Sequence, residues 1–346
     1  MSEKPLNIAT LGAGSIGCYL GGCLAAAGIN VTFIGRERMQ QQLLTHGLRL
    51  SDWQGRDSFI AAKLLNYSLS INSLSMVTSS HIDYILVTVK SGDTQSVIDS
   101  IAKHVDSDVI IVSFQNGIRN GELLSQGLPN HQVLTGMVPF NVLAKGDGNF
   151  HCGTEGNLTI ADKNGLATSL INAFEEAQLP VDIYDDLTPI QWSKLILNLN
   201  NSINALSGLP LKTQLSDRNY RKVLALSIRE ALYVLNKANI KTVKTGKVIV
   251  QLIPFILLLP NSLFKIVASS MIKIDPTARS SMYEDFTLGR QTEIDYLNGE
   301  IVALAKQLNI LSPVNIAIMN LVKQAERTGK GSPKLTANAL LNYITN

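Results

Sequence analysis

The stretch at residues 6–36, LNIATLGAGSIGCYLGGCLAAAGINVTFIGR, decides the fold of this chain of 346 residues. Residues 6–11 are mostly apolar and predict a buried strand that leads directly into a glycine-rich turn. An alanine- and leucine-rich helix is expected to about Ala27, and residues 31–34 predict a second strand. A strand, a glycine turn, a helix and a strand within about 30 residues form the context in which GxGxxG indicates a dinucleotide site.

Each glycine of this turn has a distinct expected role. Gly12 permits the tight turn, Gly14 lets the backbone approach a pyrophosphate, and Gly17 lets the helix pack close to the strand. Free N–H groups and the positive end of the helix dipole then face the phosphates. The alternative is a tight turn in an α/β protein that binds no ligand. The residues expected to bind the cofactor here are Gly12, Ala13, Gly14, Ser15, Ile16 and Gly17.

The end of the second predicted strand indicates which dinucleotide is bound. A site that prefers NAD usually has Asp or Glu there to hold the ribose 2′-hydroxyl. This chain has Gly35-Arg36, with Arg38 two residues further on. A carboxylate would repel a 2′-phosphate, whereas a guanidinium can bind it with two hydrogen bonds. We therefore expect NADPH as the cofactor; the alternative is a solvated arginine that follows a strand.

Length and composition limit the classes of protein to consider. A chain of this length suggests two domains, and 45% hydrophobic residues suffice for real cores. The net charge of +3 is too mild to indicate nucleic acid as a partner. The most apolar run, residues 248–259, contains Pro254 and is too short to span a bilayer, so we expect a buried helix or an interface patch and no membrane partner.

Cysteine content and the N-terminus bear on the compartment. The three cysteines, Cys18, Cys23 and Cys152, lack metal-ligand spacing, and no metal site is expected. An odd number of cysteines suggests a reducing compartment. The first predicted strand begins almost at once, so no export segment is expected and we expect a cytoplasmic protein.

The remaining pattern predicts an α/β domain of the Rossmann type at residues 1–186 and an all-helical domain at residues 187–346, with the site in the cleft between them. A second crossover is expected within residues 37–56. Further strands are expected at residues 47–52, 59–64, 84–89, 109–114, 133–138, 157–160 and 181–184. Helices are expected at residues 167–177, 189–206, 217–238, 249–258, 280–308, 314–327 and 332–345.

Polar residues follow two of the predicted strands. Lys90 ends the strand at residues 84–89, and Gln115-Asn116-Gly117 follows the strand at residues 109–114. Ligands of doubly wound sheets bind beyond the carboxyl ends of the strands. We therefore expect cofactor and substrate to meet near Lys90 and Asn116.

Two stretches of the helical half carry candidate chemistry. Lys194 and Asn198 are four residues apart and share a helix face, and a lysine there is a natural proton donor to a carbonyl that accepts hydride. In the second stretch, Ser281 suits a substrate carboxylate and Glu293 suits a substrate hydroxyl. The alternatives are a surface lysine and a solvated acidic helix face, and Asp285 and Arg290 are expected to pair with each other.

The chain resembles the ketopantoate reductase (2-dehydropantoate 2-reductase) family over nearly its whole length. The stretches that carry the resemblance are LGAGSIGCYLGG, VTVK ending at Lys90, QNG at Asn116, WSKLILN around Lys194, SSMYEDF at Ser281, GRQTEIDYLNGEIV around Glu293, and SPVN at residues 312–315. The resemblance implies NADPH-dependent reduction of 2-dehydropantoate to pantoate, on the route to pantothenate and coenzyme A.

The resemblance also implies roles for single residues. Lys194 is the implied general acid, and Glu293 holds the substrate beside the cofactor. Substrate would be bound by Asn116, Asn198 and Ser281, while Lys90 and Arg36 would line the cofactor site together with Asn116. The family pattern places a second asparagine where this chain has Ser202, and Asn201 or Asn204 is expected to take that role.

Two other functions remain open at this stage. One is a reductase of another branched 2-oxo acid, or an enzyme like a 3-hydroxyacid dehydrogenase. The other is a non-catalytic protein that senses NADPH, which would need neither Lys194 nor Glu293. The oligomeric state is not given by the sequence, although the apolar helical half is compatible with the homodimer that the resemblance suggests.

Overall fold

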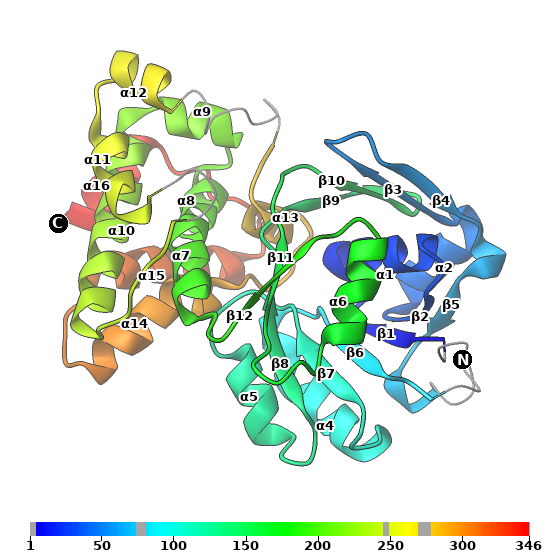
Figure 1. Cartoon of the computed structure of the whole chain (residues 1–346). Helices are drawn as coiled ribbons and strands as arrows, with labels where there is room; N and C mark the ends of the chain where they lie inside the picture. The colour runs from blue at the N-terminus through cyan, green and yellow to red at the C-terminus, as the bar shows by residue number, and fades with distance from the viewer. Residues whose placement is uncertain (1–4, 74–80, 245–248, 269–277, 346) are drawn as a thin grey trace. The chain divides into compact units, whose positions relative to one another are not determined.

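The computed structural model describes residues 5–73, 81–244, 249–268 and 278–345. The chain divides into two compact units, Met1–Leu187 and Thr188–Asn346 (Figure 1). The first unit combines a mainly parallel sheet with helices, and the elements described in the second unit are all helical. The predicted fold class, a Rossmann-type domain followed by a helical domain, is confirmed.

An eight-stranded sheet forms the centre of the first unit, in the order β12-β11-β8-β7-β6-β1-β2-β5. Neighbouring strands are parallel except β8 and β11. The strands are β1 Asn7–Leu11, β2 Asn30–Ile34, β5 Asn66–Ser68, β6 Tyr84–Val87, β7 Ile110–Ser113, β8 Val133–Met137, β11 Leu158–Ala161 and β12 Val181–Tyr184. The α-helices in the described residues of this unit are α1 Ser15–Ala26, α2 Glu37–His46, α4 Thr94–His104, α5 Asn120–Gly127 and α6 Thr168–Glu176.

Helices cover both faces of this sheet, which explains why its central strands are mostly apolar. Along β6, Tyr84 and Leu86 belong to one hydrophobic cluster, whereas Ile85 and Val87 belong to another. Successive side chains of a strand point to opposite faces, so each face has its own core. Strands that are buried on both faces lack the alternation of polar and apolar residues that marks a half-exposed strand.

A second, four-stranded sheet has the order β4-β3-β10-β9. Its strands are β3 Leu48–Asp52, β4 Asp57–Ile60, β9 Val142–Gly146 and β10 Asn149–Cys152. The strand predicted at residues 47–52 is confirmed. The prediction for residues 59–64 is wrong in extent, because the strand ends at Ile60 and a 3-10 helix, Ala62–Leu64, follows. The second crossover thus consists of α2 and two strands of this sheet, before β5 returns to the main sheet.

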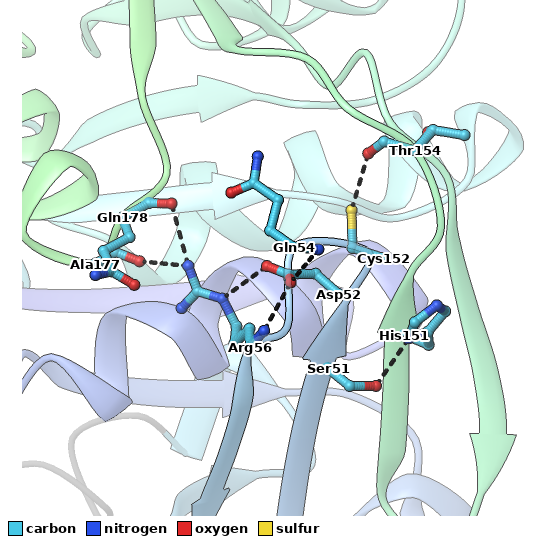
Figure 2. A network of polar contacts seen from close by, with 9 residues as sticks. All are labelled: Ser51, Asp52, Gln54, Arg56, His151, Cys152, Thr154, Ala177 and Gln178. Atoms are coloured by element: carbon cyan, nitrogen blue, oxygen red, sulfur yellow. Dashed lines mark hydrogen bonds and ion pairs between the residues drawn. The ribbon is translucent and has the colours of Figure 1, made fainter.

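Polar contacts around Arg56 connect the second sheet to the rest of the unit (Figure 2). The Arg56 guanidinium donates to the backbone carbonyls of Ala177 and Gln178, at 3.0 and 3.1 Å, and to the Asp52 carboxylate at 3.3 Å. Asp52 also accepts from the backbone N–H of Gln54 and of Arg56. The turn between β3 and β4 is therefore held against the segment that follows α6.

The second unit contains ten helices within its described residues. They are α7 Thr188–Asn198, α8 Asn200–Ser207, α9 Leu211–Ser216, α10 Arg218–Lys237, α11 Ile253–Leu258, α12 Asn261–Val267, α13 Ser281–Thr287, α14 Asn298–Gln307, α15 Pro313–Thr328 and α16 Ala337–Thr345. None of the helices in the described part of the chain combines the length and the apolarity that crossing a bilayer requires.

Four of the predicted helices begin or end at other residues in the structure. The helix predicted at residues 189–206 is two helices, α7 and α8, with Leu199 between them. The segment 280–308 contains α13, a 3-10 helix at Ile294–Tyr296, and α14, because Gly289 has a φ of +61° and ends the first helix. Residues 249–258 begin with a 3-10 turn, Val250–Leu252, and the last helix starts only at Ala337.

A buried polar cluster joins α10, α14 and α15. The Asn315 side chain accepts from Ser227 Oγ (2.8 Å) and Asn298 Nδ2 (2.9 Å) and donates to Glu230 Oε1 (2.7 Å). The Glu230 carboxylate also accepts from the backbone N–H groups of Val314 and Asn315. A carboxylate at a helix N-terminus satisfies amides that lack an intrahelical partner. Glu230, together with the side chain of Asn315 in the SPVN stretch, therefore fixes the start of α15.

Candidate active site

The glycine turn between β1 and α1 has the shape that a dinucleotide site requires. Gly12 has a φ of +113°, and a Cβ there would lie 2.6 Å from Val89 N. A Cβ on Gly17 would lie 2.2 Å from Gly12 O, so α1 packs against the turn only because both residues are glycines. A Cβ on Gly14 would have its nearest neighbour, Gly12 O, 4.0 Å away. The space beside Gly14 and the first turn of α1 is thus open to a ligand.

Arg36 stands at the start of α2, as its N-cap residue. Its side chain is 82% exposed and has one guanidinium nitrogen 3.8 Å from the carboxylate of Asp93. An exposed ion pair at that distance contributes little and can exchange for another anion. Tyr67 Oη donates to Arg36 O (3.1 Å), and a Cβ on Gly35 would lie 2.5 Å from that hydroxyl. Tyr67, which the sequence analysis did not single out, therefore fixes the backbone that carries Arg36.

A network of buried polar side chains connects the loops after β6 and β7. Ser91 Oγ donates to Asn116 O (2.9 Å), and the Asn120 side-chain amide donates to both Ser91 Oγ and Asn116 O. Thr94 Oγ1 donates to Asn120 Oδ1 and accepts from Gln115 Nε2, each at 2.9 Å. Lys90 directly precedes this network, and the side chain of Asn116 remains exposed. The first unit therefore places Lys90 and Asn116 at neighbouring strand ends, as predicted.

Lys194 lies in α7, and two opposing effects determine the pKa of its ammonium group. Burial is the larger effect and lowers the pKa to about 8, whereas the Glu293 carboxylate raises it. The fold thus brings Glu293, about a hundred residues later in the chain, into electrostatic contact with the lysine. A lysine with a pKa near neutrality can release a proton far more readily than an exposed one.

The asparagines that follow Lys194 differ in their surroundings. Asn204 is fully buried: its side-chain amide donates to Leu209 O (2.9 Å) and Gln214 Oε1 (3.1 Å), and its oxygen accepts from Ser280 N (2.9 Å). Ser202 is also buried, and its hydroxyl donates to Leu199 O. The side chains of Asn198 and Asn201 are partly exposed. Asn204 and Ser202 therefore serve the packing of the second unit.

Ser280 and Ser281 begin α13 and have different roles. Ser280 is buried, accepts from Tyr283 N as the helix cap, and donates to Asn201 O (3.1 Å). Ser281 is the first residue of the helix, and it is exposed. Arg290 N donates to Asp285 O (2.8 Å) at the end of α13; this is a backbone hydrogen bond, and the pairing of the two charged side chains stays a prediction.

The loop that carries Glu293 is attached to α15 on both sides of this residue. Thr292 N donates to Glu326 Oε1 (2.7 Å), and Lys323 Nζ lies 2.6 Å from Asp295 Oδ1. Glu293 O accepts from Tyr296 N (3.0 Å), which forms the following 3-10 turn. Sequence reasoning missed Lys323 and Glu326, and no local pattern marks them, because they come from a helix that begins 20 residues later.

Comparison with known proteins identifies a family whose models match both halves of this chain. Residues 8–165 match the family described as ketopantoate reductase PanE/ApbA, and residues 186–326 match its C-terminal part, ketopantoate reductase PanE/ApbA C terminal. The chain is 28% identical over 338 residues to a 2-dehydropantoate 2-reductase from Pyrococcus horikoshii, which covers 94% of this chain and all of that protein.

Solved structures show the same fold. A PanE/ApbA family ketopantoate reductase from Ralstonia eutropha JMP134 superposes with a TM-score of 0.78 at 27% identity, over 94% of this chain and 100% of the other. A D-mandelate dehydrogenase, solved with NADH and anilino(oxo)acetate, has a TM-score of 0.74 at 20% identity, over 94% of this chain and 99% of the other. At that identity the second likeness concerns the fold alone.

Proposed function

Because this chain belongs to the ketopantoate reductase PanE/ApbA family, we propose that it reduces 2-dehydropantoate to pantoate with NADPH. The observation that carries the proposal is the pair Lys194 and Glu293, in which burial and a nearby carboxylate bring a lysine pKa to about 8. A relative named 2-dehydropantoate 2-reductase that matches over its whole length supports the substrate.

The first unit is proposed to bind NADPH. The backbone of residues 12–17 would hold the pyrophosphate beside the open space at Gly14. Arg36 would exchange its distant contact with Asp93 for the 2′-phosphate, and Lys90 and Asn116 would line the same site. When bound, the reduced nicotinamide supplies the hydride that reduces the 2-oxo carbon.

The second unit is proposed to supply the proton and the contacts to the substrate. Lys194 Nζ donates a proton to the carbonyl oxygen, which becomes the new hydroxyl, and its positive charge stabilises the alkoxide as it develops. Glu293 keeps part of Lys194 protonated and accepts a hydrogen bond from the hydroxyl that ketopantoate carries. The lysine is reprotonated from solvent after each turnover.

Asn198, Ser281 and Asn116 are proposed to bind the substrate carboxylate and carbonyl. Asn201 is proposed to take the role of the family's second helix asparagine, because Asn204 and Ser202, the residue at the family position, already make hydrogen bonds inside the helical unit. Asn204 uses its amide and its oxygen for packing, and Ser202 donates to a backbone carbonyl.

An assay of NADPH oxidation over a panel of 2-oxo acids tests the proposal. If Glu293 holds the substrate hydroxyl, a 2-oxo acid that lacks it leaves a carboxylate unpaired, at a cost of about 1–3 kcal/mol. We therefore expect kcat/KM for ketopantoate to exceed that for 2-oxoisovalerate by at least about tenfold.

Glu293→Ala should reduce this preference mainly by lowering kcat/KM for ketopantoate. Glu176→Ala, which removes an exposed carboxylate from α6, far from this loop in the chain, is the control and should keep the preference. If the wild-type protein prefers 2-oxoisovalerate, it reduces another 2-oxo acid. If it oxidises NADPH with none of the acids, the reductase proposal is wrong.

A further inference from the structure

The outer surface of α11 and α12 exposes an unusual amount of apolar side chain. Phe255 is 70% exposed and Ile266 is 71% exposed, although both are large hydrophobic residues. Four neighbours in the same hairpin are each about half exposed. We call the whole set the hairpin patch: Ile249, Leu252, Phe255, Leu263, Ile266 and Val267.

The inner face of the same two helices is apolar as well. Ile253 and Leu257 in α11, and Phe264 in α12, are buried against the rest of the helical unit. A helix at a water-exposed surface normally has a polar outer face. Here large apolar side chains occupy much of the outer face, beside the exposed polar residues Asn261, Ser262 and Lys265 of α12, so the hairpin patch is expected to be covered by an apolar partner.

A buried arginine holds the hairpin in place. Arg221, in α10, is fully buried and donates to the carbonyls of Leu257 and Leu259, each at 2.9 Å, and to the side chain of Asn261. Its guanidinium also lies 4.0 Å from the ring centroid of Phe264. These contacts fix the turn between α11 and α12, so the hairpin patch cannot turn inward without breaking them (Figure 1, yellow).

The charged residues in the sequence segment that carries the hairpin patch are all basic. Residues 231–274 contain six lysines and no arginine, aspartate or glutamate. Lys265 is exposed within α12 itself, between Phe264 and Ile266. Lys241 and Lys244 are exposed in a segment that lies beside the start of the hairpin, because Gln251 Nε2 donates to Thr242 Oγ1. An apolar surface bordered by lysines fits a partner that is apolar and negatively charged.

We propose that the hairpin patch binds the surface of an anionic lipid bilayer, with Phe255 and Ile266 inserted and the lysines at the headgroups. A symmetric contact with a second copy fits less well, because it would place the same lysine-bordered surface against itself. The proposal goes beyond the proposed reductase activity. It differs from the sequence-based expectation of no membrane partner, which rested on the absence of a spanning segment.

Co-sedimentation with vesicles tests this inference. The full chain should bind vesicles of phosphatidylcholine with phosphatidylglycerol, bind phosphatidylcholine alone much more weakly, and lose binding as salt is raised. Phe255→Ser combined with Ile266→Ser should weaken binding at least about tenfold, because less apolar surface is inserted. Lys265→Gln should weaken binding about fivefold, the effect of one basic residue near an anionic surface.

Leu311→Ser is the matched control, since Leu311 is 86% exposed and lies outside the hairpin patch. It should bind vesicles like the wild type. Circular dichroism and the thermal midpoint establish that each variant is folded, independently of any enzyme activity.

Two results would overturn the inference. One is a wild-type protein that does not sediment with anionic vesicles at low salt. The other is a dimer, measured by analytical ultracentrifugation, that the Phe255 and Ile266 changes dissociate while vesicle binding is unaffected; a second copy of the chain would then be the partner.

Discussion

The pH dependence of the reaction should report directly on the Lys194 and Glu293 pair. A proton donor acts only while it is protonated, so kcat should fall as the pH rises through the pKa of Lys194. With a pKa of about 8, roughly one tenth of the lysine is protonated at about pH 9, whereas an ordinary lysine would remain almost fully protonated there. The decline of kcat on the alkaline side of the pH profile, here called the alkaline limb, is therefore expected near pH 8.

Glu293→Gln removes the negative charge and keeps the size of the side chain. The carboxylate raises the pKa of Lys194 against the effect of burial, so its loss should lower that pKa and move the alkaline limb to lower pH. Glu176→Gln makes the same change of charge at an exposed residue of α6 and should leave the limb in place.

The assay is kcat for NADPH oxidation at saturating ketopantoate, measured from about pH 6 to about pH 10. At saturating ketopantoate, a weaker substrate affinity of the Glu293 variant does not lower the measured rate. The pH profile of kcat then reports the protonation of the acid alone. Lys194→Ala should lower kcat by roughly 10²–10⁴-fold. The reasoning is refuted if kcat of the wild type stays nearly constant up to about pH 9, as it would with an ordinary lysine as the acid, or if Glu293→Gln does not shift the pH at which kcat falls.

Three further predictions concern the cofactor turn and the helix asparagines. Arg36→Ala should raise KM for NADPH about ten- to a hundred-fold and leave KM for NADH nearly unchanged; equal KM values in the wild type would contradict the role. Gly17→Ala should destabilise the first unit in a urea titration, because its Cβ meets Gly12 O, whereas Gly14→Ala should stay folded and weaken NADPH binding measured by fluorescence. Asn204→Ala should cost about 1–3 kcal/mol of unfolding free energy, while Asn201→Ala should lower kcat/KM without a comparable loss of stability.

The strands of the main sheet were predictable because their signal is local. The runs in β1, β6 and β7 are mostly apolar and almost fully buried, as strands covered on both faces are. The hairpin of β9 and β10 was missed, because β9 is mostly exposed and offers no apolar run. Positive φ angles at Gly146, Asp147 and Gly148 form its turn, and the sequence GDG was the signal that could have revealed it.

Helix limits were harder to predict than helix positions. The spacing of apolar residues across 189–206 continues past Leu199, where α7 ends and α8 begins. Periodicity alone therefore suggested one helix. In the segment 280–308, Gly289 was a visible signal for a helix end, but the loop that follows it is held by Glu326 and Lys323 of α15. Contacts between distant segments determine the conformation of such a loop, and the helix propensities of its own residues do not contain that information.

The sequence by itself determined the dinucleotide turn, the expected 2′-phosphate partner Arg36, and the candidate acid Lys194. Each depends on neighbours within a few residues, since the glycines shape a single turn and Arg36 lies two residues after a single strand. Only the tertiary structure decided that Asn204 is used for packing, because its oxygen accepts from Ser280, 76 residues away. The tertiary structure also decided the pKa of Lys194, since burial and the field of Glu293 arise only when distant helices pack together.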